Sequence, residues 1–264
     1  MSNWQTLTAE LDRWAQAGRA ATLWWRDDDA VAATPALNRL LQAARQPGGS
    51  TVPICLAVIP AEADGTLADL AARNPHLSVL QHGFAHRNHA PAHEKKVELG
   101  AHRTAAVILK ELAEGRQRLR QLFRESFLPV LVPPWNRIEP AVRGGLAGIG
   151  LTYVSIYGPR APGDRTSVNT HVDIIDWHHG RGFIGEEAAL RLLTGHLAAR
   201  REERADPAEP TGLLTHHLVQ DDACWNFLRE LVYRLSRRPE VRWLAGTDIF
   251  SQTAPVAPER LILS

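Results

Sequence analysis

Residues 22–29, Thr-Leu-Trp-Trp-Arg-Asp-Asp-Asp, join a short apolar run to three consecutive carboxylates. The run Thr22–Trp25 predicts a buried β-strand, and Asp27, Asp28 and Asp29 follow it closely. Three adjacent carboxylates repel one another unless a cation or a proton compensates them. In α/β folds with parallel strands, the chemistry sits at the carboxyl ends of the strands. The triplet therefore marks a candidate site, although a solvated turn is the commoner setting for such a run.

Outward from this stretch, predicted strands and helices alternate along the chain. Short apolar runs predict about eight strands, at residues 22–25, 54–59, 77–80, 127–132, 151–156, 172–176, 212–216 and 241–244. Helical spacing predicts helices at residues 7–17, 34–44, 64–73, 104–124, 140–147, 186–204 and 222–236, and a short one near the C-terminus. Without a linker-like stretch, the pattern predicts one α/β domain over residues 1–264, with a parallel sheet closed or partly closed into a barrel. An open doubly wound sheet is the alternative, but no GxGxxG motif follows the first strand.

The composition is that of an ordinary globular protein, with 264 residues, 44% of them hydrophobic and 22% charged. The balance of 30 Lys and Arg against 29 Asp and Glu does not favour a nucleic-acid partner, which usually shows as a basic excess. No apolar run approaches the roughly 18 residues of a membrane span, and no signal peptide is visible. Only Cys55 and Cys224 occur, so a reducing compartment, the cytoplasm, is expected.

Polar clusters follow five of the predicted strands, each close to the point where the strand ends. They are Asp27–Asp29, His82-Gly-Phe-Ala-His86, Pro133-Pro-Trp-Asn-Arg137, Asp173-Ile-Ile-Asp-Trp-His-His179 and Thr215-His-His217. Each cluster alone has an ordinary explanation, such as a surface loop or a strand stop. Because the carboxyl ends of parallel strands meet at one face of a barrel, the five together predict a shared site.

The two histidines of the second cluster suggest a metal site. If a helical turn begins at His82, the imidazoles of His82 and His86 can converge on one ion. One carboxylate of the triplet would complete a three-ligand site with open positions, which is typical of catalytic rather than structural zinc. We therefore expect one divalent metal, with zinc as the first choice.

This ordered set of motifs resembles the polysaccharide deacetylases of the NodB-homology type, also called carbohydrate esterase family 4. The matching segments are Asp28-Asp29, His82-x-x-x-His86, Pro134-Trp135, Asp173-Ile-Ile-Asp176-Trp177 and Leu214-Thr215-His216, within residues 24–217. The resemblance implies a distorted (β/α)7 barrel and a metal-dependent hydrolase that removes an acyl group, above all N-acetyl, from a sugar. An acetylated carbohydrate is then the expected substrate, while the particular sugar and the oligomeric state stay open.

The resemblance also implies roles for the matching residues. Asp28 matches the general base, and His216 matches the general acid, oriented by Asp176. The metal ligands that it implies are Asp29, His82 and His86.

The walls of the substrate site are expected from the third and fourth motifs. The chain has 8 tryptophans but only 3 tyrosines, and an indole ring packs well on the apolar face of a sugar. Trp135 and Trp177 border the clusters and are the expected walls, with Arg137 as a further substrate contact. The resemblance also implies that the backbone N–H of Trp135 stabilises the oxyanion.

The chain departs from the family pattern in the first and last motifs. Asp27 stands where the family has Phe, so a shifted register, with Asp27 as the base and Asp28 as the ligand, stays open. In the fifth motif His217 competes with His216.

The third motif lacks its arginine. Val132 stands at that position, and either Arg137 or Arg26 is a candidate for the missing charge. Three residues extend the second cluster without matching the family. His89 and His93 are expected in loop or substrate contacts, with metal ligation as the less favoured alternative. Glu98 is expected at a solvated helix start, and its reaching the site is the less favoured alternative.

Two other functions compete with a deacetylase. The altered motifs are compatible with a carbohydrate-binding or regulatory protein of the same fold that has lost turnover. A glycoside hydrolase would use a carboxylate pair such as Asp28 and Asp176, but it leaves His82 and His86 without a task.

Overall fold

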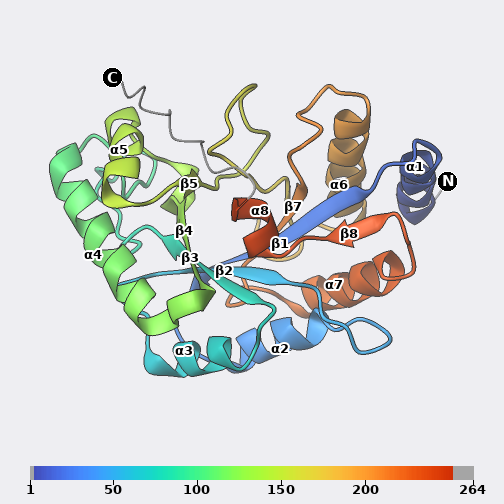
Figure 1. Ribbon diagram of the computed structural model, residues 1–264, viewed down its shortest axis with the longest axis horizontal. Helices are drawn as coiled ribbons and strands as arrows, with labels where there is room; N and C mark the ends of the chain where they lie inside the picture. Colours follow the sequence, from blue (N-terminus) through green and yellow to red (C-terminus); the bar gives the residue numbers. More distant parts are fainter. Residues whose placement is uncertain (1–2, 252–264) are drawn as a thin grey trace, which may run out of the picture.

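The computed structural model describes residues 3–251, which form a twisted parallel sheet surrounded by helices (Figure 1). The strands are β1 (Ala21–Ala30), β2 (Ile54–Val58), β3 (Leu77–His82), β4 (Phe127–Val132), β5 (Tyr153–Val154), β6 (Val172–Asp173), β7 (Thr211–Thr215) and β8 (Val241–Trp243). The α-helices are α1 (Asn3–Gln16), α2 (Pro35–Ala43), α3 (Gly65–Ala72), α4 (Ala105–Phe123), α5 (Pro140–Gly145), α6 (Glu186–Arg201), α7 (Asp222–Leu235) and α8 (Gly246–Ser251). Short 3₁₀ helices are η1 (Arg124–Ser126), η2 (Pro134–Asn136) and η3 (Ala147–Ile149). Within the described range, no helix combines the length and apolar character that a membrane crossing requires.

β1 pairs with three other strands of the sheet, β2, β7 and β8. The strand order is β5-β4-β3-β2-β1-β7-β6, and β8 pairs with the first residues of β1. All these pairs are parallel, so the carboxyl ends of the strands lie at one end of the sheet. β5 and β6 end the path, and isolated bridges at Val154–Ser167 and Tyr157–Thr170 link β5 to the segment that leads into β6. The expected fold, a distorted and partly closed barrel, is confirmed.

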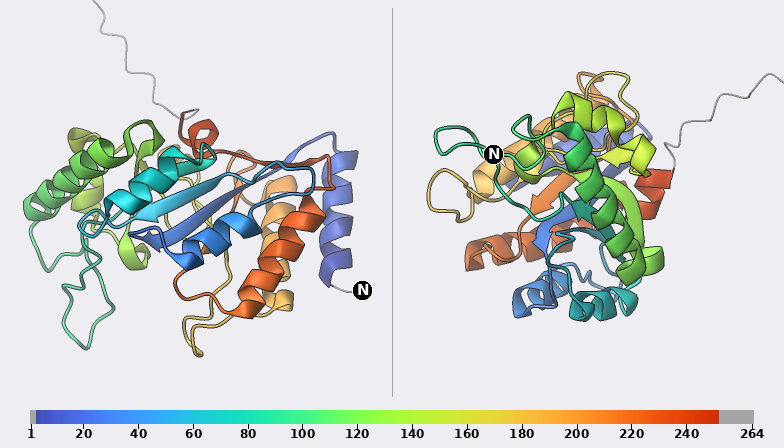
Figure 2. Two further views of the ribbon diagram at one scale, coloured as in Figure 1. Left: turned by 90° about the horizontal axis from the view of Figure 1, so that it is seen from below. Right: turned by 90° about the vertical axis from the view of Figure 1, so that its left-hand side faces the viewer.

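Three helices begin at N-cap residues of the types that favour this position. The caps are Thr34, Asp64 and Asp221, whose side-chain oxygens accept the backbone N–H three residues on. α2, α3 and α7 cover one face of the sheet, α1 packs against α6, and α4 packs against α5 (Figures 1 and 2). This layering closes the core, and it leaves the loops after β3 and β6 projecting from the same side of the molecule (Figure 2).

Alternation along β1 divides the buried side chains between two cores. Leu23 and Trp25 pack in the core between the sheet and its helices. Trp24 packs inside the barrel, where its ring meets the edge of Phe250 from α8 at a centroid distance of 5.8 Å. Because successive side chains of a strand face opposite sides, Arg26 and Asp28 also face the barrel interior.

The strand predicted at residues 22–25 extends to Ala30, so the acidic triplet lies inside β1 rather than after it. Asp27 and Asp28 are 0% and 4% exposed. A solvated turn is therefore excluded for this run. The extension is possible because each carboxylate has a buried cationic or polar partner, described below, which offsets the loss of hydration.

A second histidine cluster lies at the amino ends of β6 and β7, away from the acidic triplet. The rings of His171 and His196 stack at 3.4 Å with 15° between their planes, and Nε2 of His171 lies 3.4 Å from Oε2 of Glu209. An ion in the plane of one stacked ring lies outside the plane of the other, although imidazole binds metals in its plane. Arg160 and Arg200 add positive charge near His171. The geometry therefore suits two neutral, packed imidazoles better than a metal.

Acid is expected to destabilise the protein through this cluster. Burial holds the pKa of His171 below its usual range and lowers the pKa of His196 to about 2. Below about pH 6.5 these imidazoles are protonated in the unfolded chain but stay neutral in the folded protein. The free energy of unfolding therefore falls as the pH falls. For one such group the free energy of unfolding changes by about 1.4 kcal/mol per pH unit. Urea unfolding between about pH 7 and pH 5 measures it.

His196→Phe provides the comparison, because it keeps a flat ring for stacking and removes the titrating group. Its free energy of unfolding should decline less steeply with falling pH than that of the wild type. Equal slopes for the two proteins would contradict this assignment.

Candidate active site

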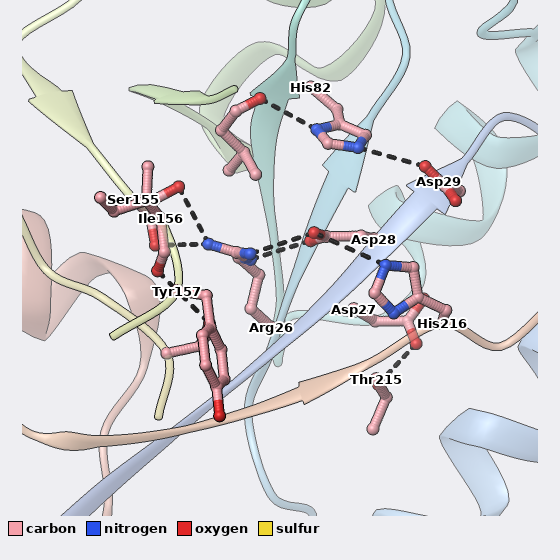
Figure 3. Close-up of polar contacts among 12 residues, drawn as sticks. Arg26, Asp27, Asp28, Asp29, His82, Ser155, Ile156, Tyr157, Thr215 and His216 are labelled. Atoms are coloured by element: carbon pink, nitrogen blue, oxygen red, sulfur yellow. Dashed lines mark hydrogen bonds and ion pairs between the residues drawn. The ribbon is translucent and has the colours of Figure 1, made fainter. Parts of the chain in front are cut away.

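The carboxylates of the acidic triplet leave β1 in different directions. Asp27 faces the helix layer, whereas Asp28 faces the barrel interior beside Arg26, as the alternation of the strand requires. Asp29 has φ +69° and lies where the pairing of β1 with β2 is irregular. Each carboxylate therefore has its own partners, although the three are consecutive (Figure 3).

Asp28 is held by Arg26 in a buried bidentate ion pair. Nε of Arg26 donates to Oδ1 at 2.8 Å, and Nη2 donates to Oδ2 at 3.0 Å. Nη1 of Arg26 in turn donates to the carbonyl oxygen and the hydroxyl of Ser155, at 3.0 and 2.7 Å (Figure 3). The sequence offers Arg26 and Arg137 as replacements for the missing third-motif arginine, and of these two Arg26 contacts Asp28. Arg137 instead donates to the backbone oxygen of Lys96 at 2.7 Å.

Asp29, His82 and His86 converge at the ends of β1 and β3. Oδ1 of Asp29 lies 3.1 Å from Nε2 of His82 and 3.5 Å from Nε2 of His86. Nδ1 of His82 lies 2.9 Å from the carbonyl oxygen of Val132, which assigns the proton of a neutral ring to Nδ1. The lone pair of Nε2 then faces the Asp29 carboxylate. Two acceptors in this arrangement need a cation or a proton between them.

The surroundings of the Asp29 carboxylate also call for a cation or a proton. Its Oδ1 is buried and has no hydrogen-bond partner among the described residues. Burial alone would raise the pKa of Asp29, but contact with His82 and the nearby charges of His216 and His86 hold it well below its usual range. One carboxylate oxygen and two imidazole nitrogens are ligands that zinc takes in catalytic sites. The residues present therefore fit a divalent ion.

His216 follows β7 and faces Asp28. Its Nε2 lies 3.9 Å from Oδ2 of Asp28, and its Nδ1 is buried without a hydrogen-bond partner among the described residues. The edge of its ring meets Trp177 at a centroid distance of 4.6 Å and an interplanar angle of 78°. The sequence-predicted pair of Asp28 and His216 is thus brought together inside the barrel (Figure 3).

His217 points the other way and belongs to a buried structural network. Its Nδ1 lies 2.5 Å from Oδ1 of Asp27, whose Oδ2 accepts from the hydroxyl of Thr215 at 2.6 Å. Trp25 donates its indole N–H to the same hydroxyl at 2.9 Å. Burial would lower the pKa of His217, but the charge of Asp27 raises it. The alternation of β7 therefore separates the two adjacent histidines between two faces of the sheet.

Asp176 does not lie beside His216, contrary to the expected pairing. Its carboxylate accepts the backbone N–H groups of His178 and His179 and contacts the ring of His179 at 3.1 Å. The reason is that β6 ends at Asp173, so Asp176 lies in the turn beyond it.

Asp173 is the fourth-motif carboxylate that faces the site. It accepts the indole N–H of Trp177 at 2.8 Å. The ring of Trp177 in turn packs against that of His216. Burial raises the pKa of Asp173, and the charge of His216 opposes that rise.

The two expected tryptophan walls flank the cluster. The ring of Trp135 lies 4.4 Å from that of His86, and Trp177 is 39% exposed beside His216. The backbone at this end is strained. Of the non-glycine residues described with positive φ, four lie here: Asp29, His86, Trp135 and Asn136. Such strain clusters at functional sites, where the surrounding structure holds it.

Glu98 is buried, and the expectation of a solvated helix start at this residue is wrong. It is 1% exposed and is not at a helix start, because residues 83–104 form a loop without a regular helix. Its carboxylate accepts backbone N–H groups of the turn that carries His86. The local sequence Lys-Lys-Val-Glu carries no signal of this burial, because the partners lie more than ten residues away.

No protein-family model and no curated protein matches the sequence. Solved structures do match. A proposed polysaccharide deacetylase from Mycobacterium smegmatis is 15% identical, and the match covers 89% of this chain and 90% of that one with a TM-score of 0.56. Bacillus subtilis PdaA, a family 4 carbohydrate esterase, is 13% identical over 93% of this chain and 89% of its own, with a TM-score of 0.49. IcaB from Ammonifex degensii is 12% identical over 67% of this chain and 97% of its own, with a TM-score of 0.43. The first of these matches confirms, for the fold, the resemblance to polysaccharide deacetylases that the motifs predict.

Proposed function

We propose that this protein is a metal-dependent hydrolase that removes an acyl group, in the first instance N-acetyl, from a sugar or glycan intermediate, with zinc as its ion. One observation carries the proposal. The cluster of Asp29, His82 and His86 lies at the same end of the barrel as the facing pair of Asp28 and His216. A three-ligand site beside a carboxylate and an imidazole is the set of groups that amide hydrolysis needs.

The residues divide the work as follows. When bound, a divalent ion would polarise the acyl carbonyl and lower the pKa of a water molecule. Asp28 accepts the proton of the attacking water. Its bidentate pair with Arg26 fixes the carboxylate plane, and each oxygen keeps a second lone pair for that proton.

His216 donates a proton to the departing amine. Its Nε2 faces Asp28, so that the base and the acid can act on the same substrate group. We assign the orienting role, expected for Asp176, to Asp173 acting through Trp177: the Asp173 carboxylate accepts the indole N–H of Trp177, whose ring packs against that of His216. Trp135 and Trp177 offer indole surfaces on either side, on which the apolar face of a sugar ring packs.

The competing functions have weaker support. A glycoside hydrolase built on Asp28 and Asp176 would need both carboxylates in the site, and Asp176 is bound in an outer turn. A binding protein without turnover was favoured by the missing third-motif arginine. The altered first motif was the other reason for it. The ion pair of Arg26 with Asp28 supports the hydrolase, because it gives the candidate base the guanidinium partner that the third motif lacks.

Loss of either histidine ligand is expected to remove most of the metal. His82→Ala and His86→Ala each delete one of three protein ligands, so metal measured by elemental analysis after dialysis against a weak chelator should fall well below one per chain. His93→Ala is the matched control, because that side chain is 81% exposed. Full occupancy in both ligand variants would rule out the assignment.

The register of the acidic triplet is tested by two isosteric changes. Asp28→Asn should keep the metal and lower acetate release about 10²–10⁴-fold, the usual worth of a general base. Asp29→Asn should lose both metal and activity. Metal content and acetate release are measured on the same preparations. Loss of metal in Asp28→Asn together with its retention in Asp29→Asn would restore the shifted register.

The two adjacent histidines should separate activity from stability. His216→Ala should lower acetate release about 10²–10⁴-fold with little change in metal content, because its role is proton transfer. His217→Ala should instead lower the free energy of unfolding by about 3–5 kcal/mol, since it leaves the Asp27 carboxylate buried and unpaired. Urea unfolding and turnover of both variants provide the measurements. An active His216→Ala beside a stable but inactive His217→Ala would reverse the assignment.

A further inference from the structure

Glu98 lies beneath the turn that leads from β3 to His86. Its Oε1 accepts the backbone N–H of Ala85 at 2.8 Å and that of Arg87 at 3.4 Å, and its Oε2 accepts that of Phe84 at 3.2 Å. Three N–H groups on both sides of His86 thus point at one buried carboxylate. If a helix began at His82, as the sequence suggests, the N–H groups of its first turn, such as that of Phe84, would have no partner within the helix. In the structure the carboxylate of Glu98 is that partner.

The turn is shaped around this carboxylate. Gly83 has φ +56°, and a Cβ atom built on it would lie 1.9 Å from Oε2 of Glu98. His86 has φ +52°, a conformation that a non-glycine residue adopts at a cost. The hydrogen bonds to Glu98 offset that cost and hold the imidazole toward Asp29, whose Oδ1 lies 3.5 Å from Nε2 of His86.

Glu98 is itself anchored from two directions. Its neighbour Leu99 forms a bridge to Ile138, in the segment after β4. The carbonyl oxygen of Glu98 accepts Nη2 of Arg103 at 3.0 Å, and Arg103 is paired with Glu111 of α4 at 2.7 Å. The backbone around Glu98 is therefore tied both to α4 and to the segment after β4, and the carboxylate has a fixed position relative to the sheet.

We propose that Glu98 is a positioning residue of the metal site: it holds the 83–87 turn so that His86 can serve as a ligand. The inference rests on the proposed function only for the presence of a metal, and it assigns Glu98 no contact with the substrate. Hydrogen-bonded groups behind metal ligands are commonly worth about 10–100-fold in metal affinity.

The test compares Glu98→Gln with Glu94→Gln in the full chain. The first change keeps the shape of the side chain but presents an amide N–H₂ to backbone donors, whereas Glu94 lies in the same loop with a side chain that is 47% exposed. Zinc affinity is measured by competition with a chromogenic chelator, and the Co²⁺-substituted proteins are compared by their visible spectra. Glu98→Gln should bind zinc about 10–100-fold more weakly and show an altered Co²⁺ spectrum, and Glu94→Gln should match the wild type.

A double-mutant cycle with His86→Ala identifies the route of the effect. If Glu98 acts through His86, its loss costs little further affinity once His86 is absent, so the two effects are strongly non-additive. Additive losses, or a Glu98→Gln protein with wild-type affinity and spectrum, would overturn the inference. So would a wild-type protein that binds neither ion. Wild-type metal binding without acetate release would count against the proposed hydrolase and leave the Glu98 result to be judged by affinity alone.

Discussion

Three consecutive carboxylates, of which Asp27 and Asp28 are buried and Asp29 is partly buried, need three separate sources of compensation, and the structure around β1 depends on that need. Asp27 meets His217, Asp28 meets Arg26, and Asp29 faces His82 and His86. Removing one partner from a buried ion pair typically costs about 3–5 kcal/mol. Since whole domains are stable by only about 5–15 kcal/mol, the strands that supply these partners must all be in register.

The partners come from segments far apart in the chain. Arg26 belongs to the same strand as Asp28, but its guanidinium is held by Ser155 at the end of β5. His217 follows β7, and His82 ends β3. β1 pairs directly with β7, which leads to His217, and with β2, which in turn pairs with β3 and so places His82 near Asp29.

Local strain coincides with the candidate active site at this end of the barrel. Asp29, His86 and Trp135 all have positive φ. Asp29 and His86 belong to the candidate metal-ligand cluster, and Trp135 packs against His86. The strain is held by buried contacts such as those of Glu98 with the 83–87 turn. In the proposed metal site, such supports fix the positions of the candidate ligands in advance, which is a condition for precise catalysis.

The sequence by itself determined the alternation of strands and helices, the barrel, and the positions of the polar clusters, because hydrophobic period and turn residues are local properties. It also placed Asp28, Asp29, His82, His86 and His216 in polar clusters close to the ends of predicted strands, and the resemblance to polysaccharide deacetylases singled these residues out within the clusters. Only the tertiary structure decided how the charges pair: Arg26 rather than Arg137 for Asp28, His217 for Asp27, and Asp173 rather than Asp176 near His216. It also buried Glu98, which the local sequence predicts at the surface. These choices depend on which strand faces lie opposite each other and on where each strand ends, and a difference of one residue in either moves a side chain to the other face of the sheet.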